Sequence, residues 1–243
     1  MKLEDRVRKK IVRAINDFGM IDDGDKIILG VSGGKDSMLL AYMLSEIRKR
    51  SKKKFEIIGV YIYKRFLITC EVDFAERMSF FEKIGIPLET VEINLPEESK
   101  LNQGVGLSCQ WCSYARRIAL MKLADKRKAN KICLGHHLDD EVITLYMNIL
   151  EGRRFKIMDP INRMDKMDVA FIRPLSYVRE KDIRELCKVL EIPFSPCLCP
   201  IGEQGRRKEI KTLLEDIEKR EPEFMEKMYF SVIKELYKDI LEK

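Results

Sequence analysis

Apolar residues along the chain form short continuous runs that alternate with helical stripes. Four segments are expected to be strands, and they are the apolar runs at 26–31 and 55–63 and the shorter segments at 88–93 and 131–135. Stripes with apolar residues three and four positions apart predict helices, which are expected at 3–18, 37–50, 71–84, 112–128 and 138–151. A strand followed by a helix, repeated four times, is typical of a parallel sheet wound by crossover helices.

The rest of the chain has a different pattern. Residues 95–108 are polar and contain Pro96, which predicts a loop, and residues 152–170 predict a long loop or a ragged hairpin. A fifth strand is expected near 170–173, and further helices are expected at 179–191, 206–220 and 222–241. We therefore expect a doubly wound, mainly parallel α/β sheet in residues 1–175 and a small helical extension in residues 176–243.

Composition supports a folded protein and leaves its partner open. The chain has 243 residues, 45% of them hydrophobic, which is enough to bury a sizeable core and excludes disorder for most of its length. Its formal net charge of +6 is compatible with a polyanionic partner without requiring one. No apolar run approaches the roughly 20 residues of a membrane span, and no secretory signal is visible. A cytoplasmic protein without a membrane segment is expected.

Four of the seven cysteines stand in two close pairs. Cys109 and Cys112 have CxxC spacing, whereas Cys197 and Cys199 lie 85 residues further along in a proline-rich break. In a reducing compartment such pairs favour a four-cysteine zinc site, an iron–sulfur cluster or a redox dithiol over structural disulfides. The other three fall in predicted strands or helices and are expected to be small buried apolar residues: Cys70, Cys133 and Cys187.

A glycine-rich turn follows the first predicted strand and precedes a helix. Its sequence is Ser32-Gly33-Gly34-Lys35-Asp36-Ser37. Adjacent glycines let backbone N–H groups converge into an anion nest at a helix N-terminus, where the serine hydroxyls and the lysine add donors and charge. The Asp36 carboxylate is compatible with bound phosphate mainly when a Mg²⁺ ion lies between the carboxylate and the phosphate. The spacing differs from that of a Walker A loop.

The hexapeptide resembles the pyrophosphate loop of N-type ATP pyrophosphatases. Further segments follow in the order found in tRNA 2-thiocytidine synthetases, and they are CQWCSYARR (109–117), GHHLDD (135–140), RPL (173–175), REKDI (179–183) and PCLC (196–199). The lead-in at 14–21 is also similar, so the resemblance covers about residues 6–230. It implies a fold of the adenine-nucleotide α-hydrolase type.

The resemblance also implies a reaction. Enzymes of this family attach AMP from ATP to the C2 oxygen of a base in tRNA and release pyrophosphate, after which sulfur displaces AMP. A 4Fe–4S cluster held by three cysteines leaves one iron open for sulfide. By position, Cys109 and Cys112 are two of the ligands. Cys199 is expected to be the third, because Cys199-Pro200 matches the Cys-Pro of related thiouridine enzymes, with Cys197 as the alternative.

The other site residues implied by the resemblance are distributed over the loop and the fourth strand. Asp36 is expected to hold Mg²⁺, and the nucleotide is expected to contact Gly30, Val31, Ser32, Gly33, Gly34, Lys35, Ser37 and His136. Asp140 and Arg116 are expected to act in catalysis, whereas Asp139 has a competing interpretation as a helix cap. The expected partners are tRNA and a sulfur donor, either sulfide or sulfur from a cysteine desulfurase, and a homodimer is left open.

One departure from the family pattern concerns the substrate. The family usually has an acidic residue at the end of its second strand, where this chain has Tyr63 followed by Lys64 and Arg65. A 2-thiouridine synthetase, or a sulfur transferase acting on a substrate other than tRNA, is therefore the alternative enzyme. A zinc-stapled ATP-binding module without enzymatic activity is the third interpretation.

Overall fold

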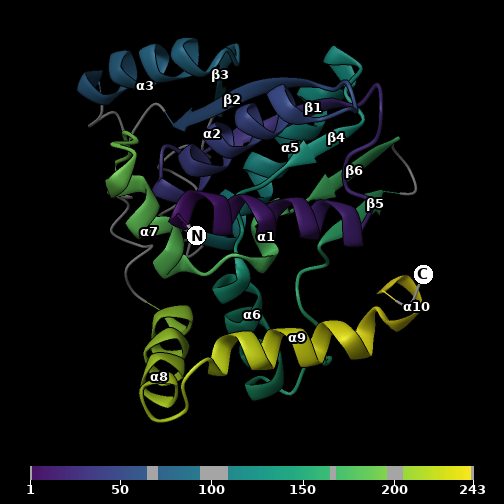
Figure 1. Ribbon diagram of the computed structural model, residues 1–243, viewed down its shortest axis with the longest axis vertical. Coiled ribbons are helices and arrows are strands. Elements are labelled where there is room, and N and C mark those ends of the chain that lie inside the picture. The colour runs from purple at the N-terminus through teal and green to yellow at the C-terminus, as the bar shows by residue number, and fades with distance from the viewer. Residues whose placement is uncertain (1, 65–70, 94–108, 165–167, 196–204, 242–243) are drawn as a thin grey trace, which may run out of the picture.

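A six-stranded sheet forms the centre of the protein (Figure 1). The computed structural model describes residues 2–64, 71–93, 109–164, 168–195 and 205–241. The strand order is β3-β2-β1-β4-β6-β5. The strands are β1 (Lys26–Val31), β2 (Glu56–Lys64), β3 (Leu88–Ile93), β4 (Lys131–Cys133), β5 (Ile161–Met164) and β6 (Val169–Ile172). All neighbours pair in parallel except β5, which is antiparallel to β6. The predicted fold class is confirmed, and the ragged hairpin at 152–170 contains β5.

The helices follow the predicted order. They are α1 (Leu3–Asp17), α2 (Lys35–Arg50), α3 (Glu71–Ile84), α5 (Cys109–Arg127), α6 (Leu138–Leu150), the 3₁₀ turn η2 (Pro174–Tyr177), α7 (Glu180–Val189), α8 (Arg206–Arg220), α9 (Phe224–Leu236) and α10 (Lys238–Leu241). The largest differences from the predicted helices are two. Helix α5 begins three residues earlier, at Cys109, and the helix expected at 222–241 is divided into α9 and α10. None of the helices in the described part of the chain is long and apolar enough to span a bilayer.

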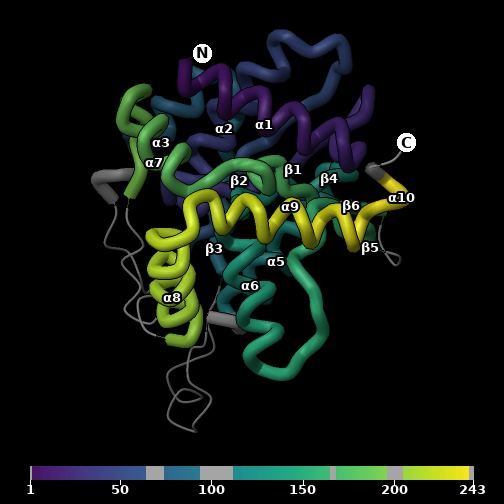
Figure 2. The backbone as a smooth tube through the Cα atoms, turned by 60° about the horizontal axis from the view of Figure 1, so that its bottom comes forward, coloured from purple at the N-terminus to yellow at the C-terminus, as the bar shows by residue number. Residues whose placement is uncertain are grey.

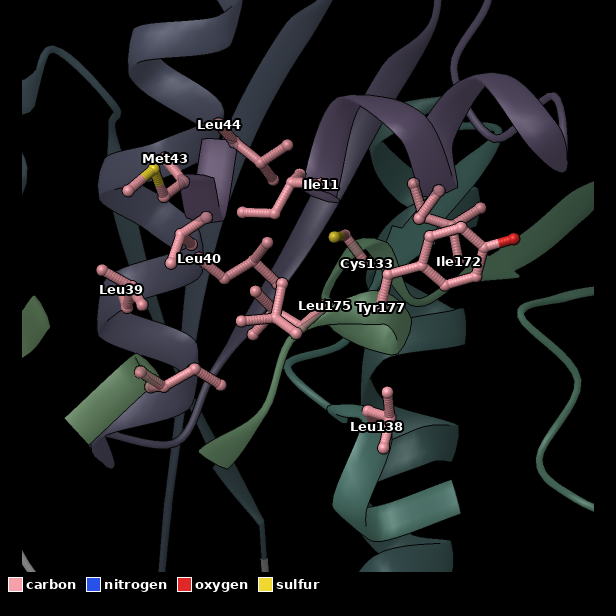
Figure 3. Close-up of a cluster of buried hydrophobic side chains, with 14 of the residues drawn as sticks. Ile11, Leu39, Leu40, Met43, Leu44, Cys133, Leu138, Ile172, Leu175 and Tyr177 are labelled. Atoms are coloured by element: carbon pink, nitrogen blue, oxygen red, sulfur yellow. The ribbon is translucent and has the colours of Figure 1, made fainter. Parts of the chain in front are cut away.

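Helices cover both faces of the sheet because side chains alternate between its faces along each strand. Ile27 and Leu29 of β1 lie in a large core cluster with residues of α1 and α2. Ile28 points to the other face, where a smaller cluster forms with Leu120 and Ala124 of α5. Figure 3 shows part of the larger cluster, in which Cys133 packs among aliphatic side chains.

Two of the three cysteines expected in the interior are buried. Cys133 is fully buried and Cys187 nearly so, which confirms both predictions. Cys70 lies outside the described residues. The same core includes Leu186 of α7 and Tyr229 of α9, so residues on both sides of position 175 share it. The division into 1–175 and 176–243 stays a prediction.

The order of the strands determines where a ligand can bind. From β1 the chain passes through α2 to β2, whereas β4 leads through α6 towards β5 and β6 on the other side of the sheet. The connections therefore diverge between β1 and β4. In open α/β sheets, ligands bind at such a switch point, outside the carboxyl ends of the strands. Helix α6, which follows β4, contacts α8 and α9, and these two helices also contact each other (Figure 2).

Candidate functional site

The phosphate loop lies at this switch point, between the end of β1 and the first turn of α2. Gly33 has φ +82°, which a residue with a side chain rarely adopts. The hydroxyl of Ser37 accepts a hydrogen bond from the Ser32 N–H (3.2 Å), and that of Ser32 accepts one from the Gly34 N–H (3.3 Å). The two serines thus hold the turn in a curled conformation. Among the expected contacts, the loop residues lie together as predicted, although ligand binding by each stays a prediction.

The end of β1 is closely packed against its neighbours. Val31 is 3% exposed, and a Cβ atom at Gly30 would lie 3.2 Å from the side chains of Leu120 and Leu134. The absence of a side chain at Gly30 therefore lets α5 and the residue after β4 approach this strand. The expected adenine contact of Gly30 and Val31 stays a prediction.

Gly135 brings the end of β4 against the start of α2. A Cβ atom on this residue would lie 3.1 Å from the backbone nitrogen of Ser37, closer than side-chain carbons normally approach backbone atoms. This close approach places the two following histidines beside the phosphate loop. The expected site segments after β1 and β4 are therefore adjacent in the fold.

His137, which the sequence analysis did not single out, occupies the centre of an acidic cluster. It is 4% exposed, and its Nε2 atom lies 3.7 Å from Asp36 and 3.5 Å from Asp140, while Nδ1 lies 3.6 Å from Asp139. Burial alone would lower the pKa of His137, but the carboxylates outweigh it and raise this pKa to about 9. The imidazole is therefore charged at neutral pH.

His136, the predicted contact of the nucleotide, has the opposite properties. Burial lowers its pKa to about 4, so the imidazole is neutral. Its Nδ1 atom is buried and has no hydrogen-bond partner. The sequence Gly135-His136-His137 identified this segment as part of the site. Two adjacent histidines at a strand end do not reveal which one lies in the charged cluster.

The two acidic residues after the histidines have different roles. Asp140 accepts a hydrogen bond from the His137 N–H (3.1 Å) and forms an ion pair with Arg207 of α8. Although burial opposes ionisation, His137 and Arg207 lower the pKa of Asp140 to about 2. Asp139 joins another helix, because it accepts hydrogen bonds from the Glu180 N–H (2.7 Å) and from Arg179 Nε (3.1 Å). The interpretation of Asp139 as the cap of its own helix is wrong.

Asp36 has an oxygen suited to a metal ion. The ammonium of Lys35 donates to its Oδ2 atom (3.1 Å) and lies equally close to Oδ1 (3.1 Å), which is buried and accepts no hydrogen bond. A carboxylate oxygen in this condition, next to a phosphate loop, fits the expected Mg²⁺ ligand. Lys35 also lies 3.0 Å from Glu180. Burial lowers the pKa of Lys35, but Asp36 and Glu180 together raise it, so the lysine is charged and paired with carboxylates.

Of the two cysteine segments, only the first lies within the described residues. Cys109 and Cys112 are in the first turn of α5, and the spacing of three places both positions on one face of the helix. Cys112 is half-buried. Cys197 and Cys199 lie outside the described residues, and no group of three metal-binding side chains occurs among the residues that are described.

Both ends of the second cysteine segment contact the site. The N–H of Ser195 donates to the carbonyl of Gly33 in the phosphate loop (3.0 Å). At the other end, Arg207 pairs with Asp140. The described residues that flank positions 196–204 are thus held at the phosphate loop on one side and at the acidic cluster on the other.

Arg116 and the arginines near the two cysteine segments differ in exposure and in pairing. Arg116 is half-buried on α5, and Arg117 is exposed with its guanidinium 5.7 Å from the ring centroid of Phe171. Arg206 pairs with Glu209 of its own helix, and Arg207 pairs with Asp140. The catalytic role of Arg116 stays a prediction.

Tyr63 stands where the family usually has an acidic residue. Its hydroxyl donates to the carboxylate of Glu92 on the neighbouring strand β3 (3.3 Å). A carboxylate is therefore present next to this position, although it comes from a different strand.

Comparisons with known proteins agree with this geometry. The family model described as a PP-loop domain matches residues 3–196. The tRNA-cytidine(32) 2-sulfurtransferase of Idiomarina loihiensis is 36% identical over 233 residues, covering 94% of this chain and 76% of that protein. The enzyme of the same name from Bdellovibrio bacteriovorus is 37% identical over 218 residues, covering 89% and 83%.

Solved structures show the same fold. The U34-tRNA thiolase NcsA from Methanococcus maripaludis, solved with its [4Fe-4S] cluster, has a TM-score of 0.79 and 22% identity, covering 99% of this chain and 80% of that one. The NMN synthetase from Francisella tularensis has a TM-score of 0.51 and 17% identity, covering 88% and 86%. By the extent of these matches, the chain belongs to the PP-loop domain family and, within it, to the family of the tRNA-cytidine(32) 2-sulfurtransferases.

Proposed function

We propose that this protein is an ATP-dependent tRNA sulfurtransferase that converts a cytidine, at position 32 as in its relatives, to 2-thiocytidine. In the first half-reaction the C2 oxygen of the base attacks the α-phosphorus of ATP, the bond to the β-phosphate oxygen breaks, and pyrophosphate leaves. In the second, sulfide attacks C2 of the base, the bond between C2 and the adenylated oxygen breaks, and AMP leaves carrying that oxygen. Membership of the sulfurtransferase family supports the reaction, and the site supports its location.

The residues of this chain have separate roles in the proposal. The backbone of Gly33 and Gly34 holds the departing pyrophosphate, and Asp36 holds Mg²⁺ through its Oδ1 atom, which accepts no hydrogen bond. Asp140, oriented by the His137 N–H and by Arg207, faces the reacting base as a catalytic carboxylate. Enclosure of the adenylated base excludes water, which would otherwise hydrolyse it.

Cysteines 109, 112 and 199 would hold a 4Fe–4S cluster, which supplies an open iron that binds the incoming sulfur. The donor is sulfide or sulfur delivered by a cysteine desulfurase, and the protein acts in the cytoplasm as a monomer or a homodimer. The observation that carries the proposal is that the described residues on either side of positions 196–204 contact the site, Ser195 at Gly33 and Arg207 at Asp140. These contacts support a role for the second cysteine pair near the ATP site.

The test combines two tRNA transcripts with anaerobically reconstituted protein. One transcript carries cytidine at position 32 and its matched control carries uridine there. With ATP, Mg²⁺ and sulfide, mass spectrometry of the digested nucleosides should detect 2-thiocytidine from the first transcript only. Formation of 2-thiouridine would support the alternative thiouridine enzyme. Stoichiometric zinc in the purified protein, without iron and without thiolation, would support the non-enzymatic module.

A further inference from the structure

A buried arginine on α3 lies beside the phosphate loop although neither the loop motif nor the family resemblance includes it. Arg77 is 4% exposed, and its guanidinium carbon lies 4.3 Å from the ring centroid of Tyr61 on β2. Tyr61 pairs in register with Val31, the residue that precedes the loop. The cation is thus held on an aromatic face next to the start of the turn.

The guanidinium is in close proximity to the turn itself. A Cβ atom on Gly33 would lie 2.7 Å from Nη2 and 3.0 Å from Cζ of Arg77. The positive φ of Gly33 already favours glycine, and the arginine adds a second reason, because a side chain there would displace the guanidinium. The two groups are therefore packed against each other at the position where phosphate is expected.

Arg77 lacks the partners that a buried cation normally has. Its Nη1 atom is buried without a hydrogen-bond partner, and it makes no ion pair with any carboxylate in the described part of the chain. A buried charge is costly unless it is paired and hydrogen-bonded. Lys35, by contrast, is engaged by Asp36 and Glu180. Two cations thus lie at the phosphate loop. Lys35 is paired with carboxylates, whereas the partner of Arg77 must come from outside the described residues.

We propose that Arg77 binds the phosphate chain of ATP and the pyrophosphate that leaves it. A guanidinium presents several N–H donors in a planar fork that matches phosphate oxygens, and such charge-assisted hydrogen bonds are stronger than neutral ones. Bound phosphate would supply the missing partner for Nη1 and neutralise the charge. The proposal rests on the ATP-dependent reaction proposed above and adds a residue on α3 to its binding site.

The experiment measures binding of pyrophosphate, ATP and AMP by calorimetry, with Mg²⁺ and without tRNA. We expect Arg77→Met to weaken pyrophosphate and ATP binding about tenfold to hundredfold, because a charge-assisted pair is lost. AMP binding should change less than about threefold, since the cation contacts the leaving phosphates. Arg127→Met is the matched control, because Arg127 is an exposed arginine at the C-terminal end of α5 that pairs with Glu89.

The outcomes separate this proposal from a structural role and from failure of the proposed function. Equal weakening of AMP and pyrophosphate, or unchanged pyrophosphate binding in Arg77→Met, would overturn the role of Arg77. If Arg77→Met does not fold, Arg77→Lys decides, because it keeps the charge but loses the fork and should weaken pyrophosphate binding severalfold while AMP binding is retained. Wild-type protein that binds neither ATP nor pyrophosphate would contradict the proposed function itself.

Discussion

Asp36 is the residue at which the phosphate loop meets the acidic cluster around His137. The Lys35 ammonium lies 3.1 Å from both carboxylate oxygens, and the His137 imidazole lies 3.7 Å from Oδ1. Oδ1 is buried and accepts no hydrogen bond from either group. Asp36 therefore offers a divalent cation one carboxylate oxygen that has no hydrogen bond.

Replacement of Asp36 by asparagine should separate catalysis from binding. Asp36→Asn keeps the size of the side chain but removes the charge that holds Mg²⁺. We expect Mg²⁺-dependent pyrophosphate release with tRNA to fall about tenfold or more, whereas ATP affinity changes by less than about threefold. Asp216→Asn, at an exposed position on α8, is the control. Unchanged turnover in Asp36→Asn would remove this residue from the mechanism.

Glu141 should make the stability of the protein fall as the pH rises. The side chain is fully buried, and burial raises its pKa to about 8. Between the ordinary pKa of a glutamate, about 4.5, and this value, the folded protein binds a proton that the unfolded chain has released. The free energy of unfolding therefore decreases with pH in this window, by up to about 1.4 kcal/mol per pH unit.

Urea unfolding of wild type and Glu141→Gln tests this expectation. The amide has no proton to lose, so the wild type should lose unfolding free energy relative to the variant as the pH rises. The raised pKa of His137 makes stability fall only from about pH 6.5 to about 9, and the lowered pKa of His136 makes it rise from about pH 4 to 6.5 in both proteins. The difference between wild type and variant is therefore followed between pH 5 and 6.5. Parallel pH profiles in that interval would show that Glu141 is ionised in the folded protein.

At the scale of elements, the start of α5 and the segment between α7 and α8 are the two places that carry cysteine pairs. Single alanine variants of Cys109, Cys112, Cys197 and Cys199, reconstituted anaerobically, should differ in iron content. We expect loss of the cluster in all but the Cys197 variant, because three ligands leave one iron open. Cys133→Ala, in the core, is the control. Equal loss in all four variants would indicate four cysteine ligands and a closed site.

Two of the three cations in the first turn of α8, Arg207 and Lys208, are expected to affect different steps of the reaction. Arg207 pairs with Asp140, whereas Lys208 is exposed and has no carboxylate partner among the described residues. Lys208→Ala should weaken tRNA binding and reduce its salt slope by about one, as expected for one phosphate contact. Arg207→Ala should mainly lower kcat, because it leaves Asp140 without its partner. Salt-titrated tRNA binding and single-turnover thiolation distinguish the two, and identical behaviour of both variants would contradict this division.

For the whole molecule, the sequence predicted local features better than contacts between distant segments. A continuous apolar run located the strand at 26–31, because a central parallel strand is buried on both faces, whereas the edge strand at 88–93 has apolar and polar residues in alternation. Strand β5 has no such run. Because of its polar residues Asn162 and Arg163, it was not predicted as a strand within the expected long loop or ragged hairpin. The glycine motif located the phosphate loop, but His137, Arg77 and Arg207 reach the site through packing between segments far apart in the sequence, which no local pattern reveals.

Arg179 joins the strand-end site to the last helices of the molecule. Its guanidinium is shared by Asp139, by Glu218 of α8 (2.6 Å) and by Glu226 of α9. Loss of one partner from a buried ion pair typically costs about 3–5 kcal/mol. Glu218 and Glu226 are therefore not free to vary as ordinary surface acids. Over evolutionary time, their replacement should be tolerated only together with changes at Arg179 or Asp139, so that these four positions are expected to be inherited as one coupled set.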